Sequence, residues 1–325
     1  MRAAIIDKAG GAFRIAAIEK PALQPGEVLV RLSAAALNPL DGKILAGAAP
    51  HAHQPFPAIL GIDGAGTIEA VGEGARLRAG DEVFGMIGGV GGHQGTLAEF
   101  IAVAGELLAK KPAKLDMRQA AALPLVFITA WEGLVDRAGL QAGQSVLVLG
   151  GAGGVGQMAI QIARAAGAKV FATGSSARSR MTIEQLGAVF VDRAVPVGDY
   201  VARHTGGRGF DIVFDTAGGA SLDAAFNAVC RFGHVVSSLG WGSHVLAPLS
   251  FKAATYSGIF TLQPLLTGEG QAHHGEIMAE AARLADAGRL TPGLDPRRFA
   301  LADTGRAFDA LTDGSAQGKI VVDIG

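Results

Sequence analysis

The fold of this chain is indicated most clearly by residues 145–180, which read SVLVLGGAGGVGQMAIQIARAAGAKVFATGSSARSR. Its apolar start, Ser145–Leu149, predicts a buried strand, and the glycines that follow have the spacing G-x-G-x-x-G. Apolar residues at helical spacing come next, Gly167 ends the helix, and residues 169–173 predict a second strand. A strand, a glycine turn, a helix and a parallel strand form the unit that binds the pyrophosphate of a dinucleotide.

The glycine turn supplies the backbone groups for that interaction. Glycines allow a sharp turn and a close approach of N–H groups, and the following helix adds its positive N-terminal dipole. The alternative is a turn that serves only the close packing of helix against strand. We expect contacts with the dinucleotide from six residues: Gly151, Ala152, Gly153, Gly154, Val155 and Gly156.

The residues after the second strand indicate which dinucleotide binds. An NAD site usually has an acid there, which accepts a hydrogen bond from the ribose 2′-hydroxyl. This chain has no acid at that point and offers hydroxyl groups and guanidinium groups, which suit a 2′-phosphate. We therefore favour NADP(H) over NAD(H), leaving open whether the key arginine is Arg178 or Arg180; the alternative is a solvated basic start of a helix. The expected contacts are Gly174, Ser175, Ser176, Arg178 and Arg180.

Length and composition limit the other possibilities. The chain has 325 residues, 18% of them charged, and a formal net charge of −1, which argues against nucleic acid or an anionic membrane as the main partner. No apolar run is long enough to span a bilayer, and the N-terminus does not read as a signal peptide. The single cysteine, Cys230, is expected to pack in a helix over residues 220–231. The default expectation is a cytoplasmic protein.

The pattern of elements changes along the chain. The first third predicts strands at residues 2–7, 13–18, 27–36 and 66–71, separated by Gly and Pro, as in an antiparallel barrel. From Gln119 helices alternate with buried strands, which predicts an α/β fold with a doubly wound parallel sheet. A last strand at residues 319–324 is expected to return to the first domain. We therefore predict two domains, 1–118 with 262–325, and 119–261.

Several motifs along nearly the whole chain resemble the medium-chain dehydrogenase/reductase superfamily. They are Asn38-Pro39-Leu40-Asp41; Gly61-Ile62-Asp63-Gly64-Ala65-Gly66 with Val71-Gly72; Gly80-Asp81-Glu82-Val83; Leu123-Pro124 with Thr129-Ala130; the glycine turn; and Gly318-Lys319-Ile320-Val321-Val322. The branch that the chain resembles most is the zinc-free quinone oxidoreductases, including zeta-crystallin. The resemblance implies a discontinuous GroES-like barrel domain, a Rossmann domain, NADPH, a homodimer, and reduction of quinones or activated alkenes. We expect the dimer to form through an edge strand within residues 244–258.

The residue types argue against a zinc centre. A catalytic zinc takes about three Cys, His or Asp/Glu ligands. In zinc-dependent relatives a Cys comes near the position of Asn38, and His-Glu occupies the place of Ile62-Asp63, so both positions differ here. One alternative is an unrelated site formed by the loop histidines His51, His53 and His93. Without a strong Lewis acid, conjugated carbonyl compounds are easier acceptors than simple ketones.

The resemblance also suggests catalytic residues. Asn38 matches a residue that lines the nicotinamide pocket, although Asn before Pro also fits an Asx turn. Lys43 stands where quinone oxidoreductases often have a tyrosine, and it is either a donor to a developing oxyanion or a surface lysine. Thr129 matches a threonine that reaches the nicotinamide, and the alternative is a hydrogen bond back to its own helix. Asp63 is expected to orient the barrel loops or Lys43.

Further candidates come from strand ends and loops. We expect Leu239, Gly240, Phe260 and Leu262 to contact the dinucleotide, since ligands bind at the carboxyl ends of parallel strands. Residues 51–57 and 88–95 are expected to border the substrate entrance, and three aromatic residues are candidates for an apolar acceptor pocket: Phe56, Phe127 and Trp241. The predicted function is NADPH-dependent, zinc-independent reduction of a quinone or an α,β-unsaturated carbonyl compound. The alternatives are a reductase of enoyl thioesters or aldehydes, and a non-catalytic, crystallin-like NADPH-binding protein.

Overall fold

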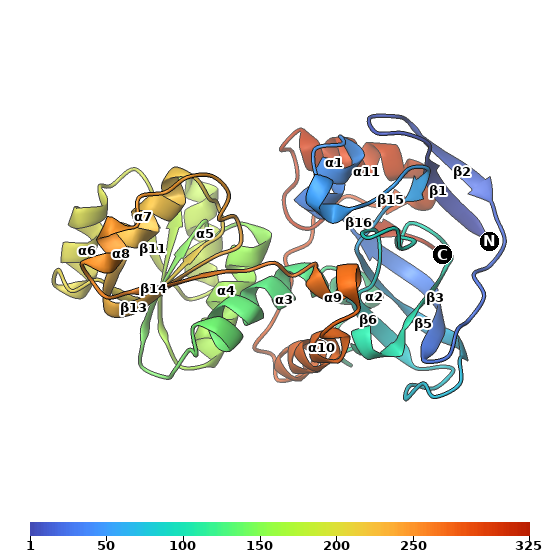
Figure 1. Ribbon diagram of the computed structural model, residues 1–325, viewed down its shortest axis with the longest axis horizontal. Coiled ribbons are helices and arrows are strands. Elements are labelled where there is room, and N and C mark those ends of the chain that lie inside the picture. The colour runs from blue at the N-terminus through green and yellow to red at the C-terminus, as the bar shows by residue number, and fades with distance from the viewer. The chain divides into compact units, whose positions relative to one another are not determined.

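The computed structural model describes all residues, 1–325, and divides the chain into two compact units. We call Met1–Leu125 with Leu262–Gly325 the first unit, and Val126–Thr261 the second unit (Figure 1). The predicted fold class is confirmed, because a β-rich unit is interrupted by a unit with a parallel sheet and covering helices. Residues 119–125, which the sequence assigns to the second domain, belong to the first unit, where α2 (Met117–Ala121) packs against its sheet.

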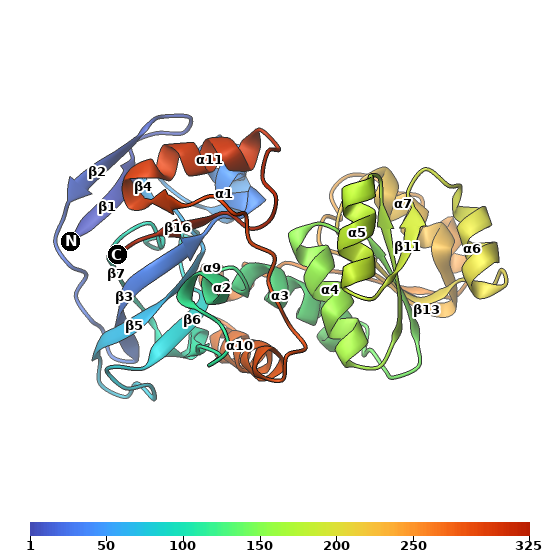
Figure 2. The same cartoon turned by 180° about the vertical axis from the view of Figure 1, so that it is seen from behind.

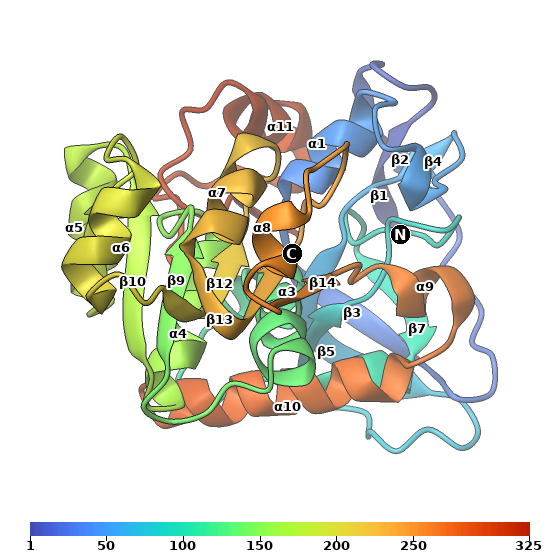
Figure 3. The same ribbon diagram turned by 60° about the vertical axis from the view of Figure 1, so that its left-hand side comes forward.

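The second unit is built on a six-stranded, wholly parallel sheet (Figure 3). Its order is β11-β10-β9-β12-β13-β14, so the chain moves outward from β9 in one direction and then in the other. Such a reversal brings two strand ends and their loops together at the carboxyl edge of β9 and β12. The strands are β9 (Ser145–Leu149), β10 (Lys169–Gly174), β11 (Val189–Asp192), β12 (Phe210–Asp215), β13 (Val229–Ser237) and β14 (Thr255–Gly258).

Helices cover both faces of this sheet. On one face α4 (Gly154–Ala165) packs against β9 and β10, and α5 (Ala177–Gln185) packs against β10 and β11 (Figure 2). The other face has a continuous apolar core beneath α6 (Val197–Thr205), α7 (Ala220–Ala228) and α8 (Ala247–Ser250). The helix predicted at residues 125–135 is α3 (Pro124–Trp131), which continues as the π-helix η3 (Glu132–Arg137).

The prediction for Cys230 is wrong in one respect. The expected helix over residues 220–231 ends at Ala228, and Cys230 lies in strand β13. Pairing explains the change, because Val229 already pairs with Phe210 of the buried strand β12. The thiol is buried as expected, and this burial raises the pKa of Cys230.

The first unit contains a seven-stranded and a three-stranded sheet. The long strand β3 pairs antiparallel with β5, β7 and β16, so the last strand of the chain returns to the first unit as predicted. The strands are β1 (Arg2–Ile6), β2 (Phe13–Ala17), β3 (Glu27–Ala36), β4 (Ala58–Ile59), β5 (Asp63–Val71), β6 (Glu82–Met86), β7 (Phe100–Ala104), β8 (Ala109–Lys110), β15 (Phe299–Ala300) and β16 (Val321–Asp323).

Helices flank these sheets. Helix α1 contacts α11, and α10 lies against β8 and the neighbouring turn η2 (Figures 1 and 2). The helices are α1 (Pro39–Leu45), α9 (Gln263–Thr267), α10 (Gln271–Asp286), α11 (Thr304–Thr312) and the 3₁₀ turns η1 (Pro50–Ala52), η2 (Gly105–Leu107) and η4 (Leu301–Asp303). No helix combines the length and the apolar character that crossing a bilayer requires.

Candidate active site

Two glycines of the turn after β9 are required by packing. A Cβ atom on Gly151 would lie 2.5 Å from the Cβ of Ala172 in β10. A Cβ atom on Gly156 would lie 2.3 Å from the carbonyl oxygen of Gly150. These glycines let helix α4 approach the sheet closely, as the packing interpretation predicts.

The remaining glycine of the motif, Gly153, has no such packing reason. Its φ of −73° suits any residue, and a Cβ atom there would meet only the carbonyl oxygen of Gly150, at an ordinary 3.5 Å. Gly153 is also the N-cap residue of α4, and no side chain caps this helix. An uncapped N-terminus beside an open glycine is the arrangement that admits a phosphate group. The turn therefore fits the pyrophosphate of a dinucleotide.

The loop after β10 is organised by Ser179, which stands between Arg178 and Arg180. Ser179 Oγ accepts hydrogen bonds from the backbone N–H groups of Ser175 and Ser176, at 3.0 and 2.9 Å. Ser176 is the N-cap residue of α5 and accepts a hydrogen bond from the Ser179 N–H. The exposed Arg180 forms a 2.9 Å ion pair with Glu184 and lies over the ring of Phe190. These hydrogen bonds fix the loop, in which Ser175 and Ser176 are exposed residues.

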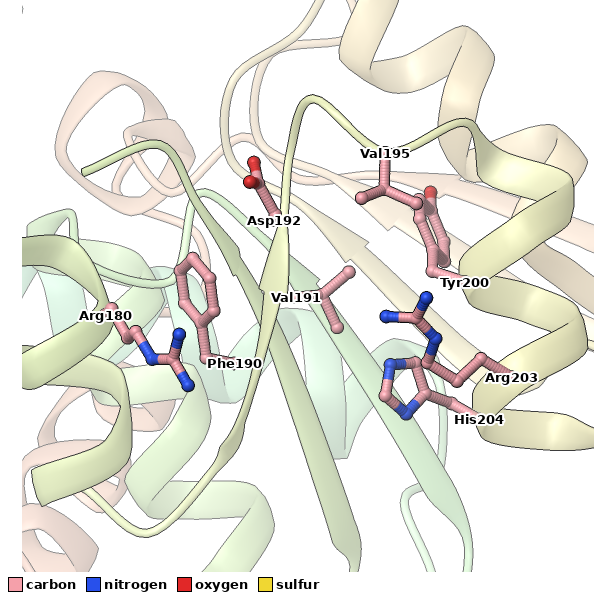
Figure 4. A pocket seen from close by; sticks show the side chains of 8 residues that line it. All are labelled: Arg180, Phe190, Val191, Asp192, Val195, Tyr200, Arg203 and His204. Carbon is pink, nitrogen blue, oxygen red and sulfur yellow. The ribbon is translucent and has the colours of Figure 1, made fainter. Parts of the chain in front are cut away.

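The neighbouring strand β11 brings another arginine to this loop. Its last residue, Asp192, pairs with Gly174, and the backbone N–H of Arg193 donates to the Gly174 carbonyl oxygen at 2.9 Å. The exposed Arg193 was missed in the sequence analysis, although a basic residue directly after a parallel strand is a usable signal. A cavity of 230 Å³ lies along β11. Figure 4 shows its lining side chains, with Arg180 on one side of the strand and Arg203 on the other.

A buried carboxylate organises the carboxyl edge at β12 and β13. Asp215 accepts hydrogen bonds from the Gly218 N–H and from the hydroxyl of Ser237, at 3.0 and 2.7 Å. Ser237 Oγ in turn accepts from the N–H of Leu239, a predicted contact residue. The next residue, Gly240, lies close to the end of the Tyr256 side chain, because a Cβ atom on it would lie 2.1 Å from the Tyr256 hydroxyl oxygen.

Thr129 belongs to a small hydroxyl network in the second unit. Its Oγ lies 3.1 Å from the Oγ of Thr261, which donates to Glu132 at 3.1 Å. Thr261 and Glu132 could not be placed in this network from the sequence, because the contacts of Thr261 join residues more than a hundred positions apart.

Other predicted residues are found in different environments. Phe260 is 38% exposed, whereas Leu262 is buried in the first unit. Phe127 is fully buried against Trp131, so it is a core residue and does not line an acceptor pocket. Trp241 is 56% exposed.

The first unit contains a buried polar cluster, which we call the Asn38–Asp63–Lys319 cluster. Asn38 Nδ2 donates to Asp63 Oδ2 at 2.9 Å, and Lys319 Nζ donates to Asn38 Oδ1. Lys319 Nζ also lies 3.4 Å from Asp63 Oδ2. The second oxygen of Asp63 accepts from the backbone N–H of Leu125 at 2.9 Å. The cation that pairs with Asp63 is therefore Lys319. Lys43, one of the two alternatives predicted for Asp63 to orient, is an exposed residue of α1.

Burial controls the electrostatics of this cluster. Asn38, Asp41 and Asp63 are fully buried, and the Lys319 side chain is 10% exposed. Burial raises the pKa of Asp63 and lowers that of Lys319, while each partner opposes the shift of the other. Burial also raises the pKa of Asp41 to about 7, although its Oδ2 accepts from the Asn38 N–H at 2.8 Å.

The cluster does not fit a zinc ion. An ammonium and a carboxamide stand with Asp63 where a catalytic zinc needs Cys, His or acidic ligands. Nowhere in residues 1–325 do three or more His, Cys, Asp or Glu side chains form a group suited to a metal, so the alternative site at His51, His53 and His93 is not formed.

The two predicted entrance loops are in contact with each other. The N–H of Gly91 donates to the carbonyl oxygen of Ala52 at 2.8 Å. Gln54 accepts from the N–H of Gly92 at 3.0 Å and donates to the carbonyl oxygen of His93 at 3.3 Å. A cavity of 350 Å³ lies along these loops.

Comparison with known families agrees with both parts of this fold. Residues 24–113 match the model of the alcohol dehydrogenase GroES-like domain, and residues 186–322 match a model described as zinc-binding dehydrogenase. These features define an oxidoreductase with an NAD(P)-binding fold. The chain belongs to the medium-chain dehydrogenase/reductase superfamily, which confirms the predicted family.

Three similar proteins illustrate the relationship. The chain is 35% identical to the 2-methylene-furan-3-one reductase of Solanum lycopersicum, over 93% of this chain and 73% of that protein. It is 34% identical to the chloroplastic NADPH-dependent alkenal/one oxidoreductase of Arabidopsis thaliana, with the same coverage. A crystal structure of an alcohol dehydrogenase superfamily protein from Novosphingobium aromaticivorans is 56% identical and has a TM-score of 0.98, covering 100% of both chains.

Proposed function

We propose that this protein is an NADPH-dependent, zinc-independent reductase of small conjugated carbonyl compounds, with enones and alkenals as the leading substrates and quinones as further acceptors. The main observation in favour is the Asn38–Asp63–Lys319 cluster, which provides a buried ammonium and a carboxamide without a set of zinc ligands. The two curated relatives above reduce compounds of this class, as their names state.

The chemistry of a conjugated acceptor matches such a cluster. Bound NADPH would supply a hydride, with its two electrons, to the carbon β to the carbonyl group. The electrons of the C=C bond then move toward the carbonyl oxygen, and a proton completes the reduction at the α carbon. Polar N–H donors stabilise the negative charge that develops on oxygen. Asn38 and Thr129 are our candidates for contacts near the reacting groups, and Lys43 remains a candidate from the resemblance.

The proposed choice of NADPH rests on the loop after β10. The loop carries Ser175, Ser176 and the exposed Arg178 and Arg180, and the exposed Arg193 follows the neighbouring strand β11. Strand β10 ends at Gly174 without a carboxylate that could accept a hydrogen bond from the ribose hydroxyl of NAD. Guanidinium and hydroxyl groups together suit the 2′-phosphate of NADPH. The name of the Arabidopsis relative includes the same cofactor.

A substrate panel tests the proposal. Purified protein is mixed with NADPH or NADH and with cyclohexenone, crotonaldehyde, crotonyl thioester or 9,10-phenanthrenequinone, and cofactor oxidation is followed by absorbance. We expect oxidation of NADPH, faster than that of NADH, with the enone or the aldehyde. Turnover of the thioester alone would favour the thioester reductase alternative. Tight NADPH binding without any turnover would contradict the proposal and favour the non-catalytic binding protein.

A further inference from the structure

The two buried lysines of the first unit differ in how their ammonium groups are satisfied. Lys111, with a side chain that is 9% exposed, has three oxygen partners: it donates to the carbonyl oxygens of Pro112 and Leu115 and forms an ion pair with Glu82 at 3.3 Å. Lys319, 10% exposed, has two acceptors, Asn38 Oδ1 and Asp63 Oδ2. Since an ammonium has three donors, Lys319 keeps one N–H group for a further acceptor.

The orientation of the Asn38 amide supports a fixed position for this ammonium. Lys319 can only donate, so it must face the amide oxygen of Asn38, and Nδ2 then faces the acceptor Asp63. Asp63 is itself held by the N–H of Leu125, and its backbone carbonyl accepts from Thr96. The hydrogen bonds therefore fix the orientation of the Asn38 amide and of the Asp63 carboxylate beside the Lys319 ammonium.

The backbone at Lys319 is equally constrained. Its N–H donates to the carbonyl oxygen of Gly293 at 2.8 Å. The preceding Gly318 has no room for a side chain, because a Cβ atom would lie 2.6 Å from the same oxygen. A rigid, nearly buried ammonium with a remaining donor is costly to maintain for packing alone.

We propose that Lys319 is a catalytic residue, whose ammonium donates its third N–H to the substrate carbonyl oxygen and stabilises the negative charge that develops there. Asn38 and Asp63 act as positioning residues that hold this ammonium. The inference rests on the proposed function and deepens it, because Lys319 supplies the positive charge that a zinc ion would supply as a Lewis acid. It also assigns the role of cationic donor to Lys319 in place of Lys43.

Matched lysine variants test this inference. Lys319→Met removes the ammonium, and Lys111→Met removes a similarly buried ammonium that has three oxygen partners. We expect Lys319→Met to lower kcat for the enone or aldehyde by about 100-fold or more, as for the loss of an oxyanion donor. NADPH affinity, measured by fluorescence titration, should stay within a factor of about three. Lys111→Met should keep the wild-type kcat.

A second variant controls for misfolding. It is needed because Lys319→Met leaves the Asp63 carboxylate buried without its cation. The double variant Asp63→Asn with Lys319→Met removes both charges, and we expect it to fold and to show the same loss of kcat. A ligand readout adds independent support: 4-nitrophenol with NADP⁺ should bind to wild type as the coloured phenolate, and to either Lys319→Met variant as the neutral phenol.

The possible results separate the two proposals. Active wild-type protein together with folded Lys319→Met variants of unchanged kcat overturns the role of Lys319. Loss of kcat in Lys43→Met but not in Lys319→Met does the same and returns the donor role to Lys43. Wild-type protein that reduces none of the acceptors overturns the proposed function, and this inference with it.

Discussion

At the scale of single residues, the glycine turn combines two requirements that a sequence motif cannot separate. Gly151 and Gly156 are needed because a side chain would overlap the sheet or the turn backbone. Gly153 has free space around it and ordinary backbone angles. The motif therefore contains two glycines that packing requires, Gly151 and Gly156, and one, Gly153, that is best explained by the binding of a dinucleotide.

Two alanine variants should separate these requirements. Gly156→Ala places a Cβ atom 2.3 Å from a carbonyl oxygen, so we expect the free energy of unfolding to fall by roughly 1–3 kcal/mol. Gly153→Ala should change stability by less than about 1 kcal/mol and weaken NADPH binding by about tenfold or more. Urea denaturation and fluorescence titration measure both quantities. Unchanged NADPH affinity in Gly153→Ala would support a turn that serves packing alone.

The arginines beside the serine loop give a second prediction at this scale. Removing a guanidinium from a phosphate site costs affinity for NADPH but not for NADH, which lacks the 2′-phosphate. We expect Arg178→Ala with Arg180→Ala to raise the Kd for NADPH by about 10-fold to 100-fold. Titration with both dinucleotides checks this. An equal loss for NADH would show that the arginines do not read the 2′-phosphate.

At the scale of elements, the start of helix α1 contains a titrating group. Asp41 accepts a hydrogen bond from Asn38 at the helix start, and its other oxygen, Oδ1, is buried without a hydrogen-bond partner. Burial is the main reason that the pKa of Asp41 rises to about 7. The native protein therefore retains a proton on Asp41 across a range of pH in which the unfolded chain has released it.

This difference predicts a loss of stability with rising pH. Between the ordinary value of 3.8 and about 7, unfolding releases the Asp41 proton, so this group lowers stability by about 1.4 kcal/mol per pH unit. Above about pH 7 the effect levels off. Residue 41 cannot titrate in the variant Asp41→Asn. The Tm of this variant minus the Tm of wild type should therefore increase from pH 5 to pH 7. Parallel Tm profiles would show that Asp41 is ionised in the native state at pH 5.

At the scale of the whole molecule, the second unit exposes apolar residues beside the edge strand β14. Phe251 is 86% exposed, Phe232 84% and Val245 73%, and β14 pairs only with β13. Exposed edges and apolar patches of this kind favour association between chains. They support the proposed homodimer through residues 244–258.

A charged substitution tests this association. We expect wild-type protein to elute with the mass of two chains, and Phe251→Asp to shift the mass toward one chain, because a carboxylate would be buried in the interface. Size-exclusion chromatography with light scattering gives both masses. Arg14→Ala, which changes an exposed residue of the first unit, serves as the control. A monomeric wild-type protein would contradict the proposal.

Elements with local signals could be predicted from the amino-acid sequence alone. Strand β9, the turn and helix α4 follow from neighbouring residues, because burial against one sheet imposes a periodic apolar pattern. The sequence also shows that no acidic residue directly follows β10 and that the chain has no cysteine ligands for a zinc ion. The prediction for Cys230 failed where a local helical pattern competed with the pairing of β13 and β12, which the pattern does not contain.

Which charged residues form the buried Asn38–Asp63–Lys319 cluster depends on the tertiary structure. Asn38 and Lys319 are 281 positions apart, and they meet because β16 returns to pair with β3. Lys43 is nearer to Asn38 in sequence, yet it lies at an exposed position of helix α1 and is not part of the buried cluster. Burial, which sets the pKa shifts of Asp41, Asp63 and Lys319, likewise depends on the packing of distant segments. Local patterns specify elements, whereas the contacts that assemble a polar site arise only when the chain has folded.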